Sequence, residues 1–315
     1  MEKSKAAAPV IRFDHSLSSR PHVVRRYKSL VAEWAIRAFR PPTTTHLQVV
    51  ASPPSGEVAV GFAGHSTALL RYHDAGILFD PMLGNWCHGV RRESTAGMAP
   101  PAKVNTILIS QASAGHLHIP TLKKLPREAT IIVPRGVARK LSKLRFARVV
   151  ELQPGSTVDT ENARITAVGT HPSSERVVNF LVEGEGPSVF LCGASGYFHG
   201  FKQIGHLYQP DIAFLPIGGY SPKSFRERHL TPPQALQAFA DLRARAFIPH
   251  HFGAFPLSYE HLLDPEVWLA KAAFDQGLQR YVFVLGPGES RTFTMPAAHL
   301  GRIDRRHQLR RSLAS

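Results

Sequence analysis

The sequence predicts a mixed α/β domain. Its 315 residues can bury a full core, and one domain of about 200 to 250 residues with extensions is the natural organisation for this length. Short apolar runs bounded by turn-forming residues recur along the chain and are typical of buried strands. Longer segments with helical spacing lie between several of these runs, so strands and helices alternate without a repeat of fixed period.

The expected elements can be placed in chain order. Strands are predicted at residues 58–62, 68–73, 77–80, 104–110, 130–133, 164–168, 177–183, 188–192 and 246–249. Helices are predicted at residues 119–125, 232–242 and 265–276. The turn-forming run Asp74-Ala75-Gly76 predicts a hairpin between the second and third strands. Thr231 followed by Pro232 has the chemistry of a helix N-cap and first turn.

Two basic extensions flank this domain. Residues 22–39 combine lysines and arginines with apolar residues near helical spacing, which predicts a basic amphipathic helix. Its apolar positions are Val23, Tyr27, Leu30, Val31, Trp34 and Phe39. Residues 41–56 are rich in turn formers and predict a linker. We therefore expect an N-terminal extension at residues 1–57, the folded domain at 58–295 and a basic C-terminal tail at 296–315.

Net charge and cysteine content restrict the partners and the compartment. Lys and Arg number 38 against 23 Asp and Glu, a net charge of +15, which favours a phospholipid surface, nucleic acid or a phosphorylated metabolite as neighbour. The arginine cluster from Arg302 onward contains no aromatic residue to stack bases, which disfavours nucleic acid. The only cysteines, Cys87 and Cys192, predict no disulfide framework. With no apolar signal core or membrane-length apolar run, we expect a cytoplasmic protein, with peripheral membrane attachment as an option.

One segment carries the strongest functional signal. The run ILISQASAGHLHIPTL, residues 107–122, resembles the strand-to-helix loop of the metallo-β-lactamase superfamily, in which a strand ending in Ser precedes His-x-His-x-Asp-His and then Leu-x-x-Pro-Thr-Leu. Further segments match in the same order: VGFAGHSTALLRYHDAGILFDPML, TAVGTHPSS, FLCGASGYFHGFKQIG, PDIAFLPIGGYSP, HLTPPQAL and IPHHFGAFPLS. The branch that includes N-acyl-phosphatidylethanolamine phospholipase D and the ascorbate-6-phosphate lactonases is the most similar. The resemblance implies a four-layer αββα sandwich.

The same resemblance implies a site with two metal ions, and most of its ligands are missing here. The four positions of the loop motif hold Gln111, Ser113, Gly115 and His116. The third ligand of the first metal corresponds to His171 and the last ligand of the second metal to His251, while the bridging carboxylate position holds Ala194. Catalytic zinc needs about three imidazole, thiolate or carboxylate donors and an open position for water. The sequence therefore excludes a binuclear centre and leaves one mononuclear option, His116, His171 and His251.

Weaker signals lie near these positions. His65 and Asp80 match supporting residues of the family and suit either a metal ligand's orienting partner or a structural hydrogen bond. His229 matches a histidine at the pocket rim, where it is a candidate general acid or substrate contact, or simply an exposed histidine. His250 is expected to face away from His251 because neighbours in a strand alternate. A basic fringe suits a phosphate-bearing ligand or plain solvent exposure: Lys202, Lys223, Arg226 and Arg228.

Two functional hypotheses follow from different classes. The first is a catalytically degenerate, non-hydrolytic protein without a metal cofactor that uses the old pocket or its basic surface for binding or assembly. The alternative is an atypical hydrolase, with one zinc ion or with metal-free histidine acid–base chemistry, acting on a phosphate-bearing or acylated lipid-like substrate. Candidate partners are an anionic membrane surface, another protein or a phosphate-bearing small molecule. The apolar positions of residues 22–39 also fit packing on the folded domain, and this alternative is slightly favoured over membrane contact.

Overall fold

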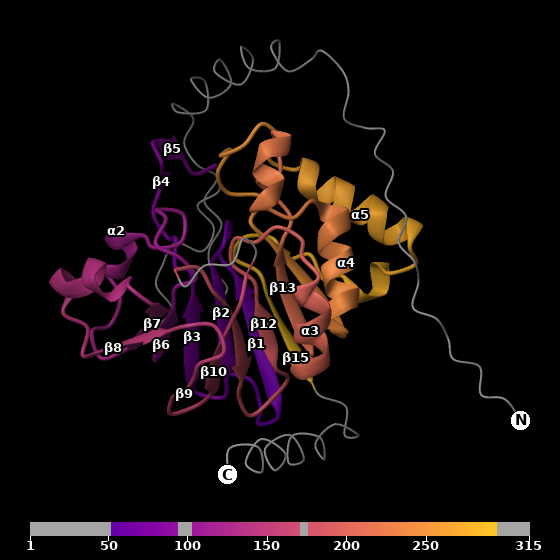
Figure 1. Ribbon diagram of the computed structural model, residues 1–315. Coiled ribbons are helices and arrows are strands. Elements are labelled where there is room, and N and C mark those ends of the chain that lie inside the picture. Colours follow the sequence, from indigo (N-terminus) through magenta and orange to yellow (C-terminus); the bar gives the residue numbers. More distant parts are fainter. Residues whose placement is uncertain (1–51, 94–102, 171–175, 295–315) are drawn as a thin grey trace, which may run out of the picture. The chain divides into compact units, whose positions relative to one another are not determined.

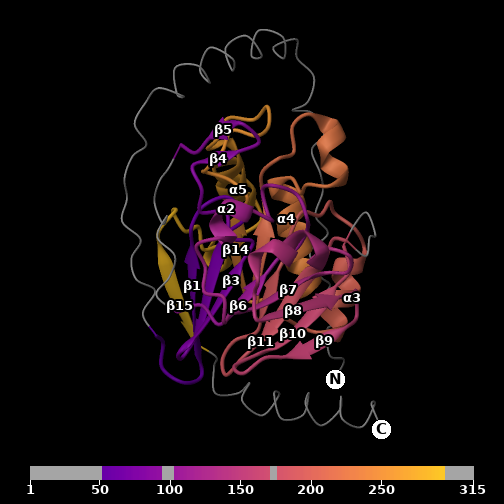
Figure 2. The ribbon, with the colours of Figure 1, turned by 90° about the vertical axis from the view of Figure 1, so that its left-hand side faces the viewer.

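Two β-sheets form the centre of the protein. The computed structural model describes residues 52–93, 103–170 and 176–294. The first sheet has the order β15-β1-β2-β3-β6-β7-β8, and in Figure 2 it runs from β15 and β1 on the left to β7 and β8 on the right. Its strands are β1 (Glu57–Phe62), β2 (Ala68–Tyr72), β3 (Ala75–Phe79), β6 (Thr106–Leu108), β7 (Thr130–Pro134), β8 (Arg148–Leu152) and β15 (Ser290–Thr294).

The second sheet has the order β14-β13-β12-β11-β10-β9. Its strands are β9 (Thr157–Asp159), β10 (Arg164–Val168), β11 (Asn179–Glu183), β12 (Val189–Leu191), β13 (Ile212–Pro216) and β14 (Ala246–His250). A short hairpin of β4 (Trp86–Cys87) and β5 (Val90–Arg91) stands apart from both sheets. In each sheet antiparallel and parallel pairs are combined: β3, β6, β7 and β8 run parallel in the first, and β12, β13 and β14 in the second.

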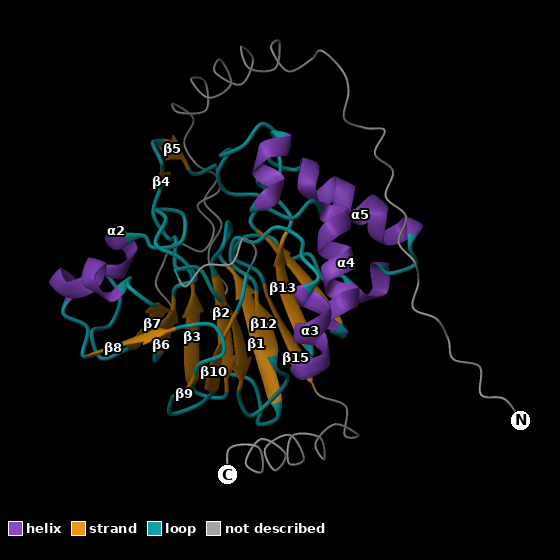
Figure 3. Ribbon diagram, viewed as in Figure 1, coloured by secondary structure: helices purple, strands orange, loops and turns teal. Residues whose placement is uncertain are grey.

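Helices cover the outer faces of both sheets (Figures 1 and 3). On the second sheet lie α3 (Gly200–Leu207), α4 (Pro232–Leu242) and α5 (Asp264–Asp275). The first sheet carries α2 (Ile119–Leu122) and the 3-10 helix η2 (Ala138–Leu144). Two further 3-10 helices are η3 (Lys223–Glu227) and η4 (Gln279–Tyr281). The arrangement is a four-layer αββα sandwich, which confirms the predicted fold class.

Side-chain alternation explains how the first sheet is buried on both faces. Leu70 and Ile77 point into the core between the two sheets, whereas their neighbours Leu69 and Leu78 belong to a separate cluster beneath α2 and η2. Successive side chains of a strand point to opposite faces. Because both faces are apolar, these strands read as continuous apolar runs in the sequence.

Local sequence signals account for several element boundaries. Helix α4 begins as expected with a capping box, in which Thr231 Oγ1 accepts from Gln234 N at 3.4 Å and Gln234 Oε1 accepts from Thr231 N at 3.0 Å. The β2–β3 turn differs from the expectation, because it consists of His73 and Asp74 while Ala75 and Gly76 already belong to β3. Gly76 has another reason to be glycine, since a Cβ there would lie 2.0 Å from Lys103 O.

The elements missed by the sequence analysis are mostly edge strands and one glycine-containing helix. The edge strand β9 and its neighbour in sequence β8 are largely exposed and carry charges, so they lack an apolar run. Helix α3 contains Gly200 and Gly205, which disfavour a helix in isolation. In the fold Gly205 faces α4 so closely that a Cβ would lie 2.2 Å from Asp241 O.

The described ranges lie within or border the predicted domain at residues 58–295. The predicted amphipathic helix and the basic tail lie outside the described residues. Across the three described ranges, none of the helices has the length and apolar character needed to span a bilayer.

Candidate functional site

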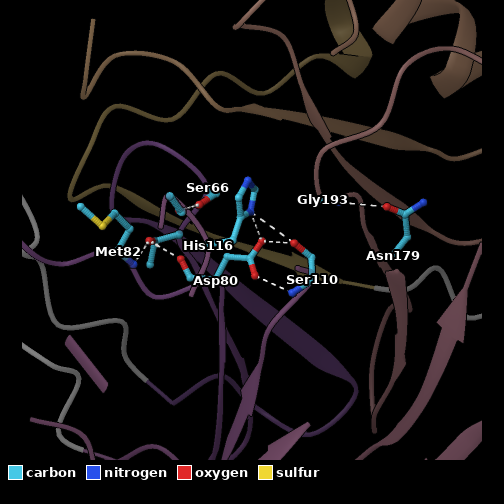
Figure 4. Close-up of polar contacts among 9 residues, drawn as sticks. Ser66, Asp80, Met82, Ser110, His116, Asn179 and Gly193 are labelled. Atoms are coloured by element: carbon cyan, nitrogen blue, oxygen red, sulfur yellow. Dashed lines mark hydrogen bonds and ion pairs between the residues drawn. The ribbon is translucent and has the colours of Figure 1, made fainter. Parts of the chain in front are cut away.

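Asp80 organises the loop that follows β6. Its Oδ1 accepts from Ser110 N at 2.7 Å and its Oδ2 from Ser110 Oγ at 2.6 Å. His116 Nδ1 lies 2.6 Å from Asp80 Oδ2 (Figure 4), and both side chains are buried. The short contact assigns a proton to Nδ1, so Nε2 is the ring nitrogen left for other partners. Asp80 therefore fixes both the position of the loop and the orientation of the imidazole.

A second group of hydrogen bonds connects this loop to the β1–β2 and β3–β4 segments. Ser66 Oγ donates to Gly115 O at 3.0 Å. Thr67 Oγ1 donates to Asp80 O at 2.8 Å and accepts from Met82 N at 2.8 Å (Figure 4). These contacts join three loops at one end of the first sheet, which explains why the GHST and FDP segments accompany the loop motif in the sequence.

Four histidines from separate loops converge beside Asp80. Ring centroids lie 4.5 Å apart for His65 and His251, 5.8 Å for His116 and His251, and 5.3 Å for His229 and His251. The backbone ties two of these loops together, because His251 N donates to His65 O at 2.6 Å. His65 and His251 have φ angles of 56° and 64°, and Asp80 has 40°. Non-glycine residues adopt such angles at a cost of about 1 to 3 kcal/mol each, and they cluster at functional sites.

Burial makes most of this cluster neutral. Desolvation lowers the pKa of His65 and of His251 well below the ordinary histidine value, and neighbouring histidines lower both further. Desolvation likewise lowers the pKa of His229 to about 4, with His116 and Arg228 adding electrostatic repulsion. At neutral pH these three rings are therefore uncharged imidazoles, the form that binds metals or accepts protons.

A buried arginine, which the sequence analysis did not identify, stands next to the histidines. The Arg92 guanidinium donates from Nε to Gly84 O at 3.1 Å, from Nη1 to Ala63 O at 3.1 Å and from Nη2 to Met82 O. It also stacks over the Phe255 ring at 4.6 Å. Burial lowers its pKa to about 10. Its partners are backbone carbonyls, which every residue carries, so no side-chain pattern in the sequence could have revealed its role.

His250 is separate from the other four histidines. Its ring is fully buried and stacks on Phe214 at 4.1 Å with an interplanar angle of 2°. Among the described side chains neither ring nitrogen has a hydrogen-bond partner of regular geometry, although a contact with the Cys192 backbone favours protonation. Burial nevertheless lowers its pKa well below the ordinary value. His250 is thus a neutral residue of the core, turned away from the pocket lined by His251.

The positions of the missing ligands have different environments. The backbone of Gln111 bridges to Val177, and Ser113 is exposed. Gly115 packs against His65, where a Cβ would lie 2.9 Å from His65 Nε2. Ala194 is partly exposed. His171 lies outside the described residues. Within residues 52–93, 103–170 and 176–294, no three His, Cys, Asp or Glu side chains are grouped as metal ligands.

A small pocket opens beside His65 and His251. Its volume is about 30 Å³, enough for a water molecule or two. It is also lined by Gly218, Gly219 and Phe255. Glu260, another residue missed in the sequence, also lines the pocket, and its Oε1 accepts from Gly219 N at 2.5 Å. His229 is partly buried rather than free on the surface, because its ring lies 6.4 Å from the Phe225 ring of η3 and next to Arg228.

Sequence and structural comparisons assign the family. Residues 76–252 match the model of the beta-lactamase superfamily domain, and the chain belongs to this family. A UPF0173 metal-dependent hydrolase of Thermofilum pendens is 31% identical over 217 residues, covering 68% of this chain and 87% of that protein. Another, from Methanopyrus kandleri, is 26% identical over 242 residues, covering 73% and 98%.

Solved structures show the same fold at lower identity. A metallo hydrolase from Ignicoccus hospitalis superposes with a TM-score of 0.61 at 23% identity, covering 76% of this chain and 100% of that protein. The metallo-beta-lactamase fold protein YhfI from Bacillus subtilis superposes with a TM-score of 0.56 at 16% identity, covering 75% and 100%. These likenesses show the same fold, and the family match and the sequence relatives confirm the predicted superfamily. The phospholipase D-like branch stays a prediction.

Proposed function

We propose that this chain is a catalytically degenerate member of its family, a non-hydrolytic protein that uses the pocket beside His65 and His251, or its basic surface, for binding or assembly. The observation that carries the proposal is the environment of Gly115. Where the family motif has an aspartate, the Nε2 atom of His65 stands 2.9 Å from the position of a Cβ. A carboxylate at residue 115 requires the His65 ring to move.

The chemistry of the remaining donors supports the same proposal. The relatives are named metal-dependent hydrolases, but the residues here do not fit a pair of metal ions. Gln111 and Ser113 offer only weak neutral donors, and Gly115 and Ala194 offer none. Two divalent ions a few ångströms apart would have no ligand carboxylate to balance four positive charges. Without a metal, the pKa of a bound water is not lowered toward neutrality, and the usual hydrolytic nucleophile is lost.

One feature favours a second candidate, an atypical hydrolase. The Asp80–His116 pair presents a lone pair at His116 Nε2, which suits either a single zinc ion or a general base. His116, His171 and His251 would be the zinc ligands, with His229 as a general acid. A phosphate-bearing or acylated lipid-like substrate would suit the basic residues around η3. The donors belong to two different metal positions of the family pattern, which makes this arrangement the less favourable one.

Metal content separates the two candidates. Elemental analysis of protein purified without chelator should find well under one equivalent of zinc, iron or manganese, and EDTA should leave the melting temperature unchanged because no metal binding is linked to folding. One metal per chain, lost in His116→Ala and in His251→Ala but kept in the exposed control His88→Ala, would contradict the proposal. That result would establish the mononuclear alternative.

A reconstruction provides the positive control for this measurement. The variant Gln111→His, Ser113→His, Gly115→Asp and Ala194→Asp restores the family donors, and His65→Ala is added in a second version to free the space at residue 115. Metal binding by the second version but not by the first would show that His65 occupies the space of the lost carboxylate. A folded protein that binds no metal in either version would mean that the loops no longer have the family geometry.

A further inference from the structure

Helix α5 carries an apolar stripe on its outer face. Val267 and Phe274 of the helix are 68% and 71% exposed, Ala270 between them is also exposed, and the N-cap residue Leu263 is 51% exposed. At about 100° per residue, these four positions fall within an arc of roughly 60°. In Figures 1 and 3 the helix lies beside α4 at the outside of the helical layer. The stripe therefore faces away from the core.

The fold does not need this stripe. The opposite side of α5 anchors the helix, because Leu269, Ala272 and Ala273 are buried in the core and the helix packs on α4. Single exposed apolar residues are ordinary, but a contiguous row on one helix face marks a contact surface. The stripe thus calls for a second apolar surface.

We infer that α5 is the interface of a homodimer in which the α5 helices of two copies pack antiparallel. The spacing of the stripe is four, three and four residues, so it reads the same in both directions along the helix. When two such helices are reversed relative to each other, Leu263 lies opposite Phe274 and Val267 opposite Ala270. Each of these two contacts then occurs twice in the dimer, as an isologous two-fold interface requires.

Charges on one flank of the stripe favour the same orientation. Lys271 and Asp264 lie on the same side of the stripe, and the Lys271 side chain is 73% exposed while pairing with Asp275 at 2.6 Å in its own helix. In a two-fold antiparallel pair equal flanks face each other, so Lys271 of each copy comes beside Asp264 of the other. In a parallel pair the opposite flanks of the two helices face each other. Lys271 would then lie about 7.5 Å along the helix axis from the acidic residue of that flank, Glu266.

The size of the stripe sets the expected strength. Helix α5 has 12 residues and is about 18 Å long, and its exposed apolar area amounts to a few hundred Å². Stable interfaces bury about 800 Å² on each copy. The dimer is therefore weak and concentration-dependent.

Sedimentation velocity of the full chain tests this interface. Between about 1 and 300 µM protein the mass should rise from monomer to dimer. Val267→Lys should weaken dimerisation at least tenfold, whereas the matched control Leu207→Lys, which changes a side chain 71% exposed on α3, should behave as wild type. Unchanged melting temperatures establish that both variants fold. A monomer at every concentration, or a dimer insensitive to Val267→Lys, overturns the inference.

A charge exchange tests the orientation. Lys271→Glu alone places like charges together at two symmetric points and should weaken the dimer several-fold. Adding Asp264→Lys reverses both charges and should recover the affinity in an antiparallel pair. A double variant as weak as Lys271→Glu contradicts the antiparallel register.

Discussion

The loops after β6 and β14 reach the same histidine cluster from the two sheets, with His116 and His251 5.8 Å apart. They differ in what they retain of the family pattern. The loop after β6 keeps the residues that fix its shape, with Ser110 and His116 bound to Asp80, but holds weak or absent donors at Gln111, Ser113 and Gly115. The loop after β14 keeps its ligand residue, His251. The backbone N–H of His251 is itself bound to His65. The difference indicates that the retained residues are those with a part in the folded structure.

The largest effect is expected when the shape-fixing residue of the first loop is altered. Asp80→Asn preserves the size of the side chain and tolerates the positive φ angle. It replaces a buried carboxylate oxygen that serves Ser110 and His116. Unfolding by urea should show a loss of about 3 kcal/mol, because buried groups lose a charged partner. Ser113→Ala, at an exposed ligand position of the same loop, should change stability by less than about 0.5 kcal/mol. Equal losses would remove the distinction between the two kinds of position.

The second-largest effect is expected at acidic pH, which should lower the free energy of unfolding through the buried histidines around His251. The folded pKa values of His65, His229, His250 and His251 are depressed by burial, so the folded protein keeps these rings neutral while the unfolded chain binds protons below about pH 6.5. The free energy of unfolding is therefore highest above pH 6.5. It falls as the pH drops from 6.5 toward the pKa values of the folded state, which is about 4 for His229. Each group contributes up to about 1.4 kcal/mol per pH unit.

Urea unfolding at a series of pH values from about 7.5 to 5 measures this slope. His250→Leu replaces the core histidine, which has no regular hydrogen bond among the described residues, with an apolar side chain of similar volume. In this variant the free energy of unfolding should depend less steeply on pH, because the contribution of one buried histidine is removed. A wild-type stability that is constant over this range would contradict the neutral-cluster assignment.

The fold was predictable from the sequence where its signals were local. Strand β10 and helix α4 have the predicted bounds because an apolar run, an N-cap and a proline mark them. Helix α3 and strand β9 were not predicted, since tertiary contact rather than propensity maintains them. The site follows the same rule. The family-like segments located Asp80, His116 and His251. Arg92 and Glu260 bind backbone groups, which every residue carries, so no side-chain pattern marked them.

The smallest effect concerns the basic surface, which would be the functional part of the protein if the loop after β6 holds no metal. We propose that the basic amphipathic segment at residues 22–39 and the tail from Arg302 attach the protein to anionic membranes. Tyr27, Leu30 and Trp34 would enter the interface while flanking arginines meet lipid phosphates. Each basic residue contributes on the order of 1 kcal/mol near an anionic surface, and salt screens this attraction.

Co-sedimentation should recover more protein with phosphatidylserine-containing vesicles than with neutral ones, and less at high salt. A chain lacking residues 1–40 and the tail should lose this preference. Equal recovery with both vesicle types, or no effect of the deletions, rules the attachment out and leaves the pocket as the site of binding.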